Sequence, residues 1–515
     1  MNKVFSWAFA GALICGLNVF TSCSDRSDNP TPPSPEKEVS SEAVYKFFKE
    51  INGVPRPSMH EEKIRQYLID FANARGLRFI EADGNIIIYK EATPGMEEAP
   101  TAILQTHMDM VCVAADGYGV DFLTTGIEQE DSDGFIHSKD YVTSLGADDG
   151  IGMAIVLAVL DSKEVEHGPL ECLFTWDEEQ GMSGARSLKP GILQGKYMLN
   201  IDNEEVGKLL VGAAGNVHVC VNKTFTPEAV PENYASFMIQ FSGLTGGHSG
   251  IMINNGGANA NKLIADFLAA EPIDYRLVNF EGGVVPNAIT TTASAVVMVP
   301  SADEDDFIAH FSSYAANAKD TYKDTDPDMS SDVHPVDGVT QCIPAEAADI
   351  LVNGLASSPQ GVLEWSVVEG MFELSNNIGV VSMDNPGEWY VKEMVRSFSD
   401  SKIDDLANQI AESFNGADVT FSDHVSPWSP DINSPLVNYA SKVYQDIHGY
   451  PIKMFIVGGS VECSIFSETY PDVQIISYGP TILDAHTIRE SVDISSVEDT
   501  WDYTLCLLRQ FNELK

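Results

Sequence analysis

The chain has 515 residues and is 44% hydrophobic, which is enough apolar surface to bury a large core in two or three folding units. Its formal net charge is −46 at pH 7. Nucleic acids and anionic membrane surfaces would repel such a chain, so neither is expected as a partner. The composition excludes a disordered protein but does not indicate a reaction.

The first residues have the pattern of an export signal. Lys3 precedes an apolar stretch at residues 4–20, and small residues stand directly before Cys23. We therefore predict a lipoprotein signal peptide over residues 1–22, lipidation of Cys23, and a flexible tether over residues 23–40. A transmembrane anchor is the alternative, but the apolar stretch is at the short limit for spanning a bilayer. The expected location is the bacterial cell envelope, with a lipid anchor in the outer membrane as the membrane attachment.

The next part of the chain alternates helical and strand patterns. Ser58 and Glu61 have capping-box spacing and predict the start of a helix, which the apolar stripe at Ile64, Leu68 and Phe71 continues. Strands are predicted at residues 85–89, 101–104, 170–175 and 196–201, and a helix at 150–160. This alternation indicates an α/β layer with helices on both faces of a sheet.

The pattern changes after residue 212. A strand at 236–241 and a helix at 258–269 indicate an α+β region, and from residue 430 the α/β pattern resumes with strands at 454–457 and 473–477 and a helix at 500–511. We therefore predict a catalytic domain in two parts, residues 41–213 and 427–515, with a lid domain inserted between them at residues 214–426.

Five residues that are suited to bind metal follow strands or glycine-bounded turns: His107, Asp148, Glu179, Asp202 and His486. Each alone has a common alternative, such as a surface histidine, a helix cap or a solvated acidic loop. Together they suit a pair of zinc ions, because two Zn²⁺ ions balance three carboxylates and a bridging hydroxide, and two neutral imidazoles complete the shells.

Two further acids have roles that this chemistry requires. Asp109 lies two residues after His107 and can orient its imidazole. Glu178 precedes Glu179 in a run of three acids that would repel one another without a cation. A hydrolase needs one such carboxylate to bind metal and another to move a proton from water to the leaving amine.

Several motifs in one order resemble a known family, the aminoacyl-histidine dipeptidases (Xaa-His dipeptidases, carnosinase-like), within the dinuclear-zinc exopeptidases. The resemblance extends over residues 44–511 and implies a catalytic domain with a mixed central sheet flanked by helices, plus an inserted lid. The motifs are residues 57–62, 107–110, 145–152, 177–182, 246–250, 259–263 and 477–481.

The resemblance also implies a role for each site residue. Asp148 would bridge two Zn²⁺ ions, for which Mn²⁺ or Co²⁺ could substitute. The other ligands would be His107 and Asp202 on one ion, and Glu179 and His486 on the other. Glu178 would be the general base that takes a proton from a zinc-bound water to give the attacking hydroxide, and Asp109 would hold His107. In the lid, His248 would help stabilise the oxyanion.

Substrate contacts are implied as well. Asn287 and Arg396 match lid positions that contact substrate, and Arg396 could clamp a free carboxylate, although a loop amide and a surface guanidinium remain alternatives. Glu462 could receive the substrate amine or be a structural carboxylate. The expected partner is a small peptide, and a homodimer is compatible with the sequence.

Two departures from the wider group bear on specificity. Asp149 follows the bridging aspartate where the wider group often has lysine, which matches the Xaa-His branch and supports that assignment. Thr487 follows His486 in place of the more usual Ser-Pro, so the choice of substrate could differ. An aminoacylase or a broader di- or tripeptidase is therefore an alternative. A catalytically dead, surface-binding lipoprotein is another, although the intact ligand set and Glu178 argue against it.

Overall fold

The computed structural model describes residues 39–514, and a compact unit begins at Ser41. The predicted signal peptide, Cys23 and nearly all of the predicted tether lie outside the described residues. Among the helices that are described, none combines the length and the apolar character needed to cross a membrane.

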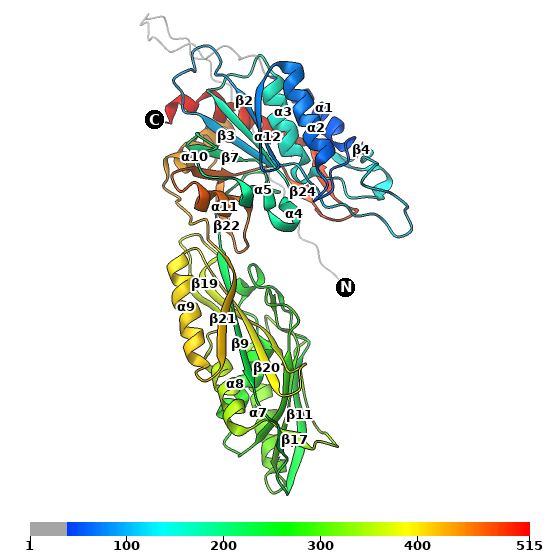
Figure 1. Ribbon diagram of the computed structural model, residues 1–515, viewed down its shortest axis with the longest axis vertical. Coiled ribbons are helices and arrows are strands. Elements are labelled where there is room, and N and C mark those ends of the chain that lie inside the picture. Colours follow the sequence, from blue (N-terminus) through cyan, green and yellow to red (C-terminus); the bar gives the residue numbers. More distant parts are fainter. Residues whose placement is uncertain (1–38, 515) are drawn as a thin grey trace, which may run out of the picture. The chain divides into compact units, whose positions relative to one another are not determined.

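An eight-stranded sheet has the order β1-β2-β6-β3-β7-β23-β8-β22 (Figure 1). Its strands β6, β3, β7 and β23 are parallel neighbours, whereas β1, β2 and the β23–β8 pair are antiparallel, so the sheet is mixed. The strands are β1 (Arg78–Ala82), β2 (Asn85–Lys90), β3 (Ala102–His107), β6 (Leu170–Thr175), β7 (Tyr197–Asn200), β8 (Lys208–Ala213), β22 (Lys453–Val457) and β23 (Gln474–Ser477).

Helices flank this sheet. Helix α3 packs on β3 and next to α1, and it is buried on nearly every side because its sequence is apolar all round (Figure 1). Side chains of α5 and α11 pack against residues such as Ile87, Ile103 and Leu173 of the strands. The helices are α1 (Glu42–Asn52), α2 (Glu62–Arg75), α3 (Ala147–Asp161), α4 (Glu178–Gly181), α5 (Ser183–Ser187), α10 (Pro435–His448), α11 (Glu462–Thr469) and α12 (Ile494–Arg509).

The start of α2 differs from the predicted capping box. The helix begins at Glu62, and its first turn receives no side-chain cap. Ser58 instead donates to the Met110 carbonyl at 3.4 Å, and Glu61 accepts from the backbone N–H of Met59 at 2.7 Å. The correct spacing was present, but tertiary contacts use both side chains.

A second sheet of nine strands lies wholly within residues 215–425. Its order is β16-β11-β15-β13-β19-β20-β9-β21, and β18 pairs with β19. The strands are β9 (Gly215–Thr224), β11 (Tyr234–Ser242), β13 (Arg276–Gly282), β15 (Ala293–Pro300), β16 (Ser330–Pro335), β18 (Gly361–Trp365), β19 (Phe372–Ser382), β20 (Glu388–Ser397) and β21 (Asp418–Val425).

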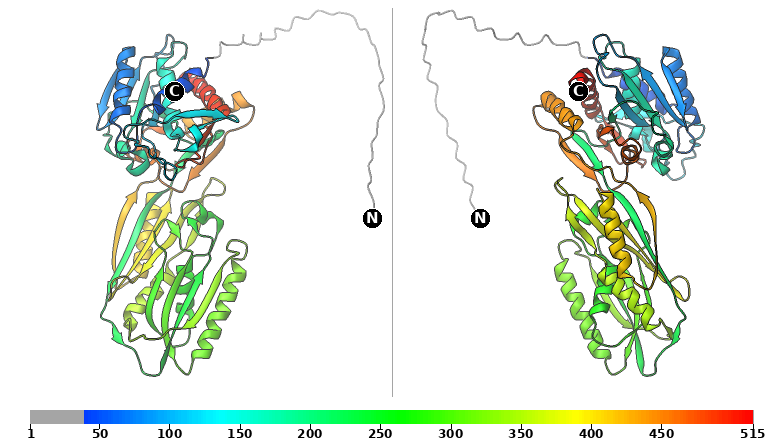
Figure 2. Two further views of the ribbon diagram at one scale, coloured as in Figure 1. Left: turned by 90° about the vertical axis from the view of Figure 1, so that its right-hand side faces the viewer. Right: turned by 60° about the vertical axis from the view of Figure 1, so that its left-hand side comes forward.

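Four helices join this sheet in one apolar core (Figure 2). Along β9 the side chains alternate: Val217, Val219 and Val221 belong to the core, whereas His218 and Cys220 are half-buried and lie on the other face. The helices are α6 (Ala260–Ala270), α7 (Glu304–Thr321), α8 (Ala345–Ser357) and α9 (Asp400–Ser413).

Short elements complete the described chain. The strands β12 and β14 pair with each other, as do β10 and β17, and a four-stranded sheet has the order β24-β25-β5-β4. Their bounds are β4 (Gln129–Ser132), β5 (Phe135–Ser138), β10 (Glu228–Ala229), β12 (Gly247–His248), β14 (Ala288–Ile289), β17 (Gln341–Cys342), β24 (Ile482–Leu483) and β25 (Ser491–Asp493), with short 3-10 helices at Lys139–Tyr141, Met252–Asn255 and Phe511–Glu513.

Candidate metal centre

Three neighbouring parallel strands deliver polar residues to one edge of the eight-stranded sheet. The strand β3 ends at His107, β6 is followed by the acids of α4, and β7 is followed by Asp202. Because parallel strands end at the same edge, residues separated by almost a hundred positions in sequence meet there. A glycine-bounded turn at the start of α3 adds Asp148, and the loop between β24 and β25 adds His486.

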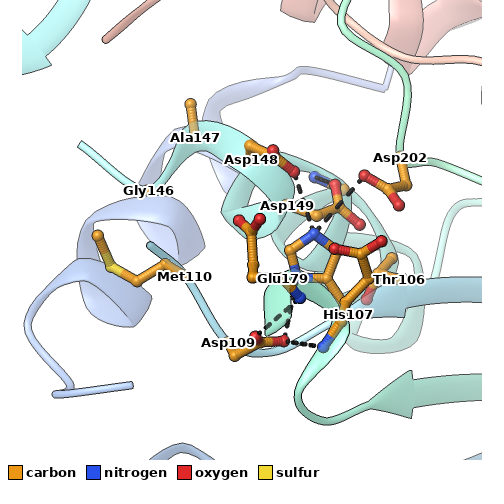
Figure 3. A network of polar contacts seen from close by, with 12 residues as sticks. Thr106, His107, Asp109, Met110, Gly146, Ala147, Asp148, Asp149, Glu179 and Asp202 are labelled. Carbon is orange, nitrogen blue, oxygen red and sulfur yellow. Dashed lines mark hydrogen bonds and ion pairs between the residues drawn. The ribbon is translucent and has the colours of Figure 1, made fainter. Parts of the chain in front are cut away.

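Asp148 lies between the two imidazoles. Its Oδ1 is 3.0 Å from His107 Nε2 (Figure 3). Its Oδ2 is 3.1 Å from His486 Nε2. On the His107 side, Asp202 Oδ1 is 3.6 Å from the same nitrogen. On the His486 side, Glu179 Oε2 is 2.9 Å from Nε2. The structure therefore brings together all five residues that were predicted to bind metal, with Asp148 in the middle.

Asp109 supports this arrangement from behind the His107 ring (Figure 3). Its Oδ1 is 3.3 Å from His107 Nδ1, on the side of the ring away from Asp148. Its two oxygens also accept the backbone N–H groups of Glu178 at 3.0 Å and Glu179 at 3.3 Å. One buried carboxylate thus fixes both the imidazole and the turn that carries the two glutamates.

The acids of the centre repel one another. Burial raises the pKa of Asp202 to about 6, and Asp148 and Glu179 add repulsion. Hydrogen bonds to Asp148 and Glu179 raise the pKa of His486 to about 11. Burial alone would lower the pKa of His107, but Asp202, Asp109 and Asp148 hold it well above its usual value. This crowding of carboxylates is relieved when positive charge binds.

The residues fit a pair of divalent cations. Two imidazoles and three carboxylates are the donor set that zinc prefers, and ligand atoms of His107, Asp148 and Glu179 all lie within 4.8 Å of one another. The second oxygen of Glu179 is buried and has no hydrogen-bond partner among the described residues. A buried, unpartnered carboxylate oxygen beside two imidazoles is suited to a metal ion.

Glu178 and Glu462 lie next to these residues. Burial raises the pKa of the Glu178 carboxyl well above its usual value, and Asp202 and Glu462 add repulsion. Glu462 is buried and accepts hydrogen bonds from Gln105 at 2.7 Å and Thr175 at 2.8 Å through one oxygen. The other oxygen of Glu462 has no hydrogen-bond partner among the described residues. Burial raises the pKa of the Glu462 carboxyl to about 8.

The predicted lid residues gather at a separate place. His248 pairs with Ala288 across β12 and β14, which places it beside Asn287, whose carbonyl accepts the Ser249 N–H at 2.8 Å. Arg396 donates to the Gly458 carbonyl at 2.8 Å. Within residues 39–514, no hydrogen bond or ion pair links His248, Asn287 or Arg396 to the five predicted ligands.

Three charged residues contact the candidate metal centre although none of them was predicted from the sequence to have a role there: Arg56, Glu61 and Glu490. Arg56 and Glu490 are buried against the turn that carries Asp148, and Glu61 accepts the Asp177 N–H at 3.2 Å. Glu61 stood in a motif but was predicted to cap a helix. For Arg56 and Glu490 the local sequence carries no signal, because their partners are 52 to 345 positions away.

Comparisons with known proteins place these observations in a family. The model described as "Peptidase family M20/M25/M40" matches residues 103–510. The cytosol non-specific dipeptidase of Escherichia coli strain K12 is 35% identical over 481 residues, which are 92% of this chain and 98% of that protein. A crystal structure of aminoacylhistidine dipeptidase from Vibrio alginolyticus has a TM-score of 0.88 and 35% identity over 92% of this chain and 98% of that chain.

The predicted location is corrected by these findings. The Escherichia coli relative, which aligns with 92% of this chain, is named a cytosol enzyme, and nothing in the comparisons indicates a lipid anchor or the cell envelope. The prediction rested on a short local pattern, an apolar stretch after Lys3 with small residues before Cys23, which lies outside the described residues. A surface-binding lipoprotein loses its support for the same reason.

More distant structures share the fold. Aminopeptidase PepT from Bacillus cereus ATCC 10987 aligns with 92% of this chain and 99% of its own at 18% identity, with a TM-score of 0.54. The predicted fold class, a mixed sheet flanked by helices with a lid, is confirmed by the family match and by the Vibrio structure. So is the predicted class of enzyme, a metal-dependent peptidase. The chain belongs to peptidase family M20/M25/M40.

Proposed function

We propose that this metallo-dipeptidase hydrolyses dipeptides of the Xaa-His type. Metal dependence is supported by the position of Asp148 between two imidazoles. Its oxygens are 3.0 and 3.1 Å from the Nε2 atoms of His107 and His486. The motifs of the Xaa-His branch, and the 35% identity to a protein titled aminoacylhistidine dipeptidase, support the substrate class.

The five ligands divide into two sets that share Asp148. His107 and Asp202 would hold one ion, and Glu179 and His486 the other, as their distances around Asp148 suggest. Zinc is the proposed metal, with manganese or cobalt as substitutes. When bound, the two ions would lower the pKa of a water molecule and polarise the scissile carbonyl.

Glu178 is the proposed general base. It accepts the proton of the attacking water and passes it to the leaving amine, which requires a carboxyl group that can both take and release a proton near neutral pH. In the metal-free protein, burial and neighbouring carboxylates raise the pKa of Glu178, which favours proton uptake. Asp109 keeps Glu178 in place through the backbone N–H and keeps His107 in one orientation.

The lid residues are proposed to bind the substrate. Arg396 is 3% exposed, and within the described part of the chain no carboxylate lies in ion-pair distance of its guanidinium. A buried cation without an acidic partner is suited to clamp the carboxylate of a dipeptide in two-point geometry. His248 would stabilise the oxyanion, and Asn287 would contact the peptide.

Glu462 is the proposed receptor for the substrate amine. Gln105 and Thr175 hold one of its oxygens, which leaves the other for an ammonium group. The arrival of that positive charge would lower the pKa of Glu462 from about 8 and draw the carboxyl into its charged form.

A broader dipeptidase is the second candidate. The Escherichia coli relative with 35% identity is named non-specific, and Thr487 follows His486 in place of the more usual Ser-Pro. The two candidates share the proposed metal centre and differ in which C-terminal residues they accept, so a substrate panel separates them.

The experiment measures metal-dependent hydrolysis of Xaa-His dipeptides, other dipeptides, tripeptides and N-acyl amino acids by chelated and reconstituted protein. We expect Xaa-His dipeptides to give the highest kcat/KM. Glu178→Gln should retain the metal and lose roughly two to four orders of magnitude in kcat. Glu97→Gln, an exposed acid outside the centre, is the matched control and should behave as the wild type.

Each outcome bears on a different part of the proposal. Equal kcat/KM across dipeptides would replace Xaa-His specificity with the broader activity, and hydrolysis only of N-acyl amino acids would indicate an aminoacylase. Near-normal turnover in Glu178→Gln would overturn the role of that residue. If the protein bound metal and hydrolysed none of these substrates, the proposal that it is a dipeptidase would be wrong.

A further inference from the structure

Glu490 makes an unusual set of contacts with the turn before α3. Its carboxylate is 2% exposed and accepts four successive backbone N–H groups. Oε2 accepts from Leu145 at 2.8 Å and Gly146 at 2.9 Å, while Oε1 accepts from Ala147 at 2.7 Å and Asp148 at 3.3 Å. Leu145 and Gly146 precede α3, and Asp148 has non-helical backbone angles. These donors therefore belong to an irregular buried turn, and Glu490 supplies the acceptors that they need.

Arg56 holds the same turn through the Gly146 carbonyl. The guanidinium is 1% exposed and donates to the Gly146 carbonyl at 2.5 Å and to the Asp109 carbonyl at 2.6 Å. Gly146 has φ +72°, and a Cβ there would come within 2.6 Å of Arg56 Nη2 and 2.7 Å of Met110 Sδ. The turn therefore has one packed conformation, with an anion on its N–H groups and a cation on its carbonyl.

The two contacts connect separate ligand-bearing segments. Glu490 lies four residues after His486, and the turn that it binds carries Asp148. Arg56 joins that turn to the segment of His107 through the Asp109 carbonyl. No local sequence contact brings these three segments together, so their relative positions depend on such cross-chain bonds.

We propose that Glu490 is a positioning residue for the metal centre. It fixes the separation of Asp148 and His486, whose ligand atoms are 3.1 Å apart, so that both are placed to bind one ion. Arg56 supports it from the opposite side of the turn. This inference rests on the ligand set proposed above. The competing possibility is that Glu490 only stabilises the fold by capping a helix.

Glu490→Gln tests the proposal, because the amide keeps the size of the carboxyl group and removes its charge. Its NH₂ group would face two N–H donors and could accept from neither. Loss of a partner that orients metal ligands typically weakens metal affinity about 10- to 100-fold. We expect that loss for at least one of the two ions, measured by competition of the metal-free protein with a chromophoric zinc chelator.

Glu171→Gln is the matched control. Glu171 is a buried carboxylate on β6 that accepts the N–H groups of Gln194 at 2.8 Å and Gly195 at 2.9 Å and contacts none of the ligands. It should lower the melting temperature of the metal-free protein and leave zinc affinity and stoichiometry unchanged. In Glu490→Gln, turnover should recover as zinc is raised, whereas a purely structural defect would not respond to zinc.

Wild-type zinc affinity in a folded Glu490→Gln protein would overturn the proposal, as would an equal loss of affinity in Glu171→Gln. If Glu490→Gln does not fold, Glu490→Asp keeps the charge with a shorter reach, and unchanged zinc affinity in that variant would also overturn it. A wild-type protein that takes up no zinc would instead refute the proposed ligand set, so the two failures are distinguishable.

Discussion

His167 is a buried imidazole far from the metal centre. It is 0% exposed, its Nδ1 lies 2.7 Å from the Gly168 carbonyl, and its Nε2 has no hydrogen-bond partner among the described residues. Burial lowers its pKa to about 4, which the Gly168 carbonyl partly opposes. In the unfolded chain a histidine has a pKa of about 6.5, so protonation favours unfolding.

The sign of the resulting pH dependence follows from the depressed pKa. The stabilisation is fully present above about pH 6.5 and is lost as the pH falls toward 4, with a slope of about 1.4 kcal/mol per pH unit. We expect the free energy of unfolding of His167→Gln to fall less steeply between pH 6.5 and 4.5 than that of the wild type. Urea unfolding of both metal-free proteins measures this, and parallel curves would contradict it.

Residues of the candidate metal centre could be proposed from the sequence where chemistry and local pattern agreed. His107, Asp148, Glu179 and Asp202 each follow an apolar strand or a glycine-bounded turn, and a metal explains why acids should gather there. Arg56 and Glu490 have no such pattern, since long-range backbone contacts define what they do. Cys23 shows the opposite case, in which a local pattern was present and the inferred location was wrong.

At the scale of elements, apolar runs in the sequence predicted where several strands lie along the chain. They did not predict the order of those strands in the sheet. The predicted strand at residues 170–175 coincides with β6, and the predicted helix at 150–160 lies within α3. The placement of β6 between β2 and β3 depends on which faces can be buried together, which no single run encodes. The hairpin of β4 and β5 was missed, because each strand has only four residues and β4 is polar and largely exposed.

Asn377 holds in place the loop between β13 and β14, which carries Asn287. The buried side chain of Asn377, on β19, donates to the Pro286 carbonyl at 2.9 Å and to the Ala288 carbonyl at 2.8 Å, on either side of Asn287. Asn377→Ala removes both bonds and also the bond at 3.2 Å that Asn377 Oδ1 accepts from Asn259 Nδ2. Each buried group left unpaired costs about 1–3 kcal/mol. We expect kcat/KM to fall roughly tenfold or more, with zinc affinity unchanged.

Steady-state kinetics and zinc competition check that expectation together. Asn385→Ala is the control, since Asn385 is an exposed asparagine in the turn between β19 and β20. It should leave both quantities unchanged. Normal kcat/KM in Asn377→Ala would show that Asn287 either stays in place without this support or does not contact the substrate.

For the whole molecule, the predicted lid has the features of an inserted domain. Its apolar core draws only on residues between Val217 and Phe414, apart from partly buried neighbours that also fall within residues 214–426. The ends of the insert meet, because Asn216 pairs with Val425 across β9 and β21. Just outside, Ala213 and Trp428 exchange backbone hydrogen bonds at 2.9 and 3.0 Å.

These features predict that residues 214–426 fold alone. A separate core supplies the burial that a domain of this size requires, and adjacent ends impose little loop-closure entropy. The fragment should unfold cooperatively in urea and take up no zinc. The complementary chain, with residues 213 and 427 joined by a short Gly-Ser linker, should take up zinc and lose dipeptide hydrolysis, because Arg396 and His248 are absent. A fragment without a cooperative transition would mean that the two sheets stabilise each other, and the boundaries at 213 and 427 would then not separate independent domains.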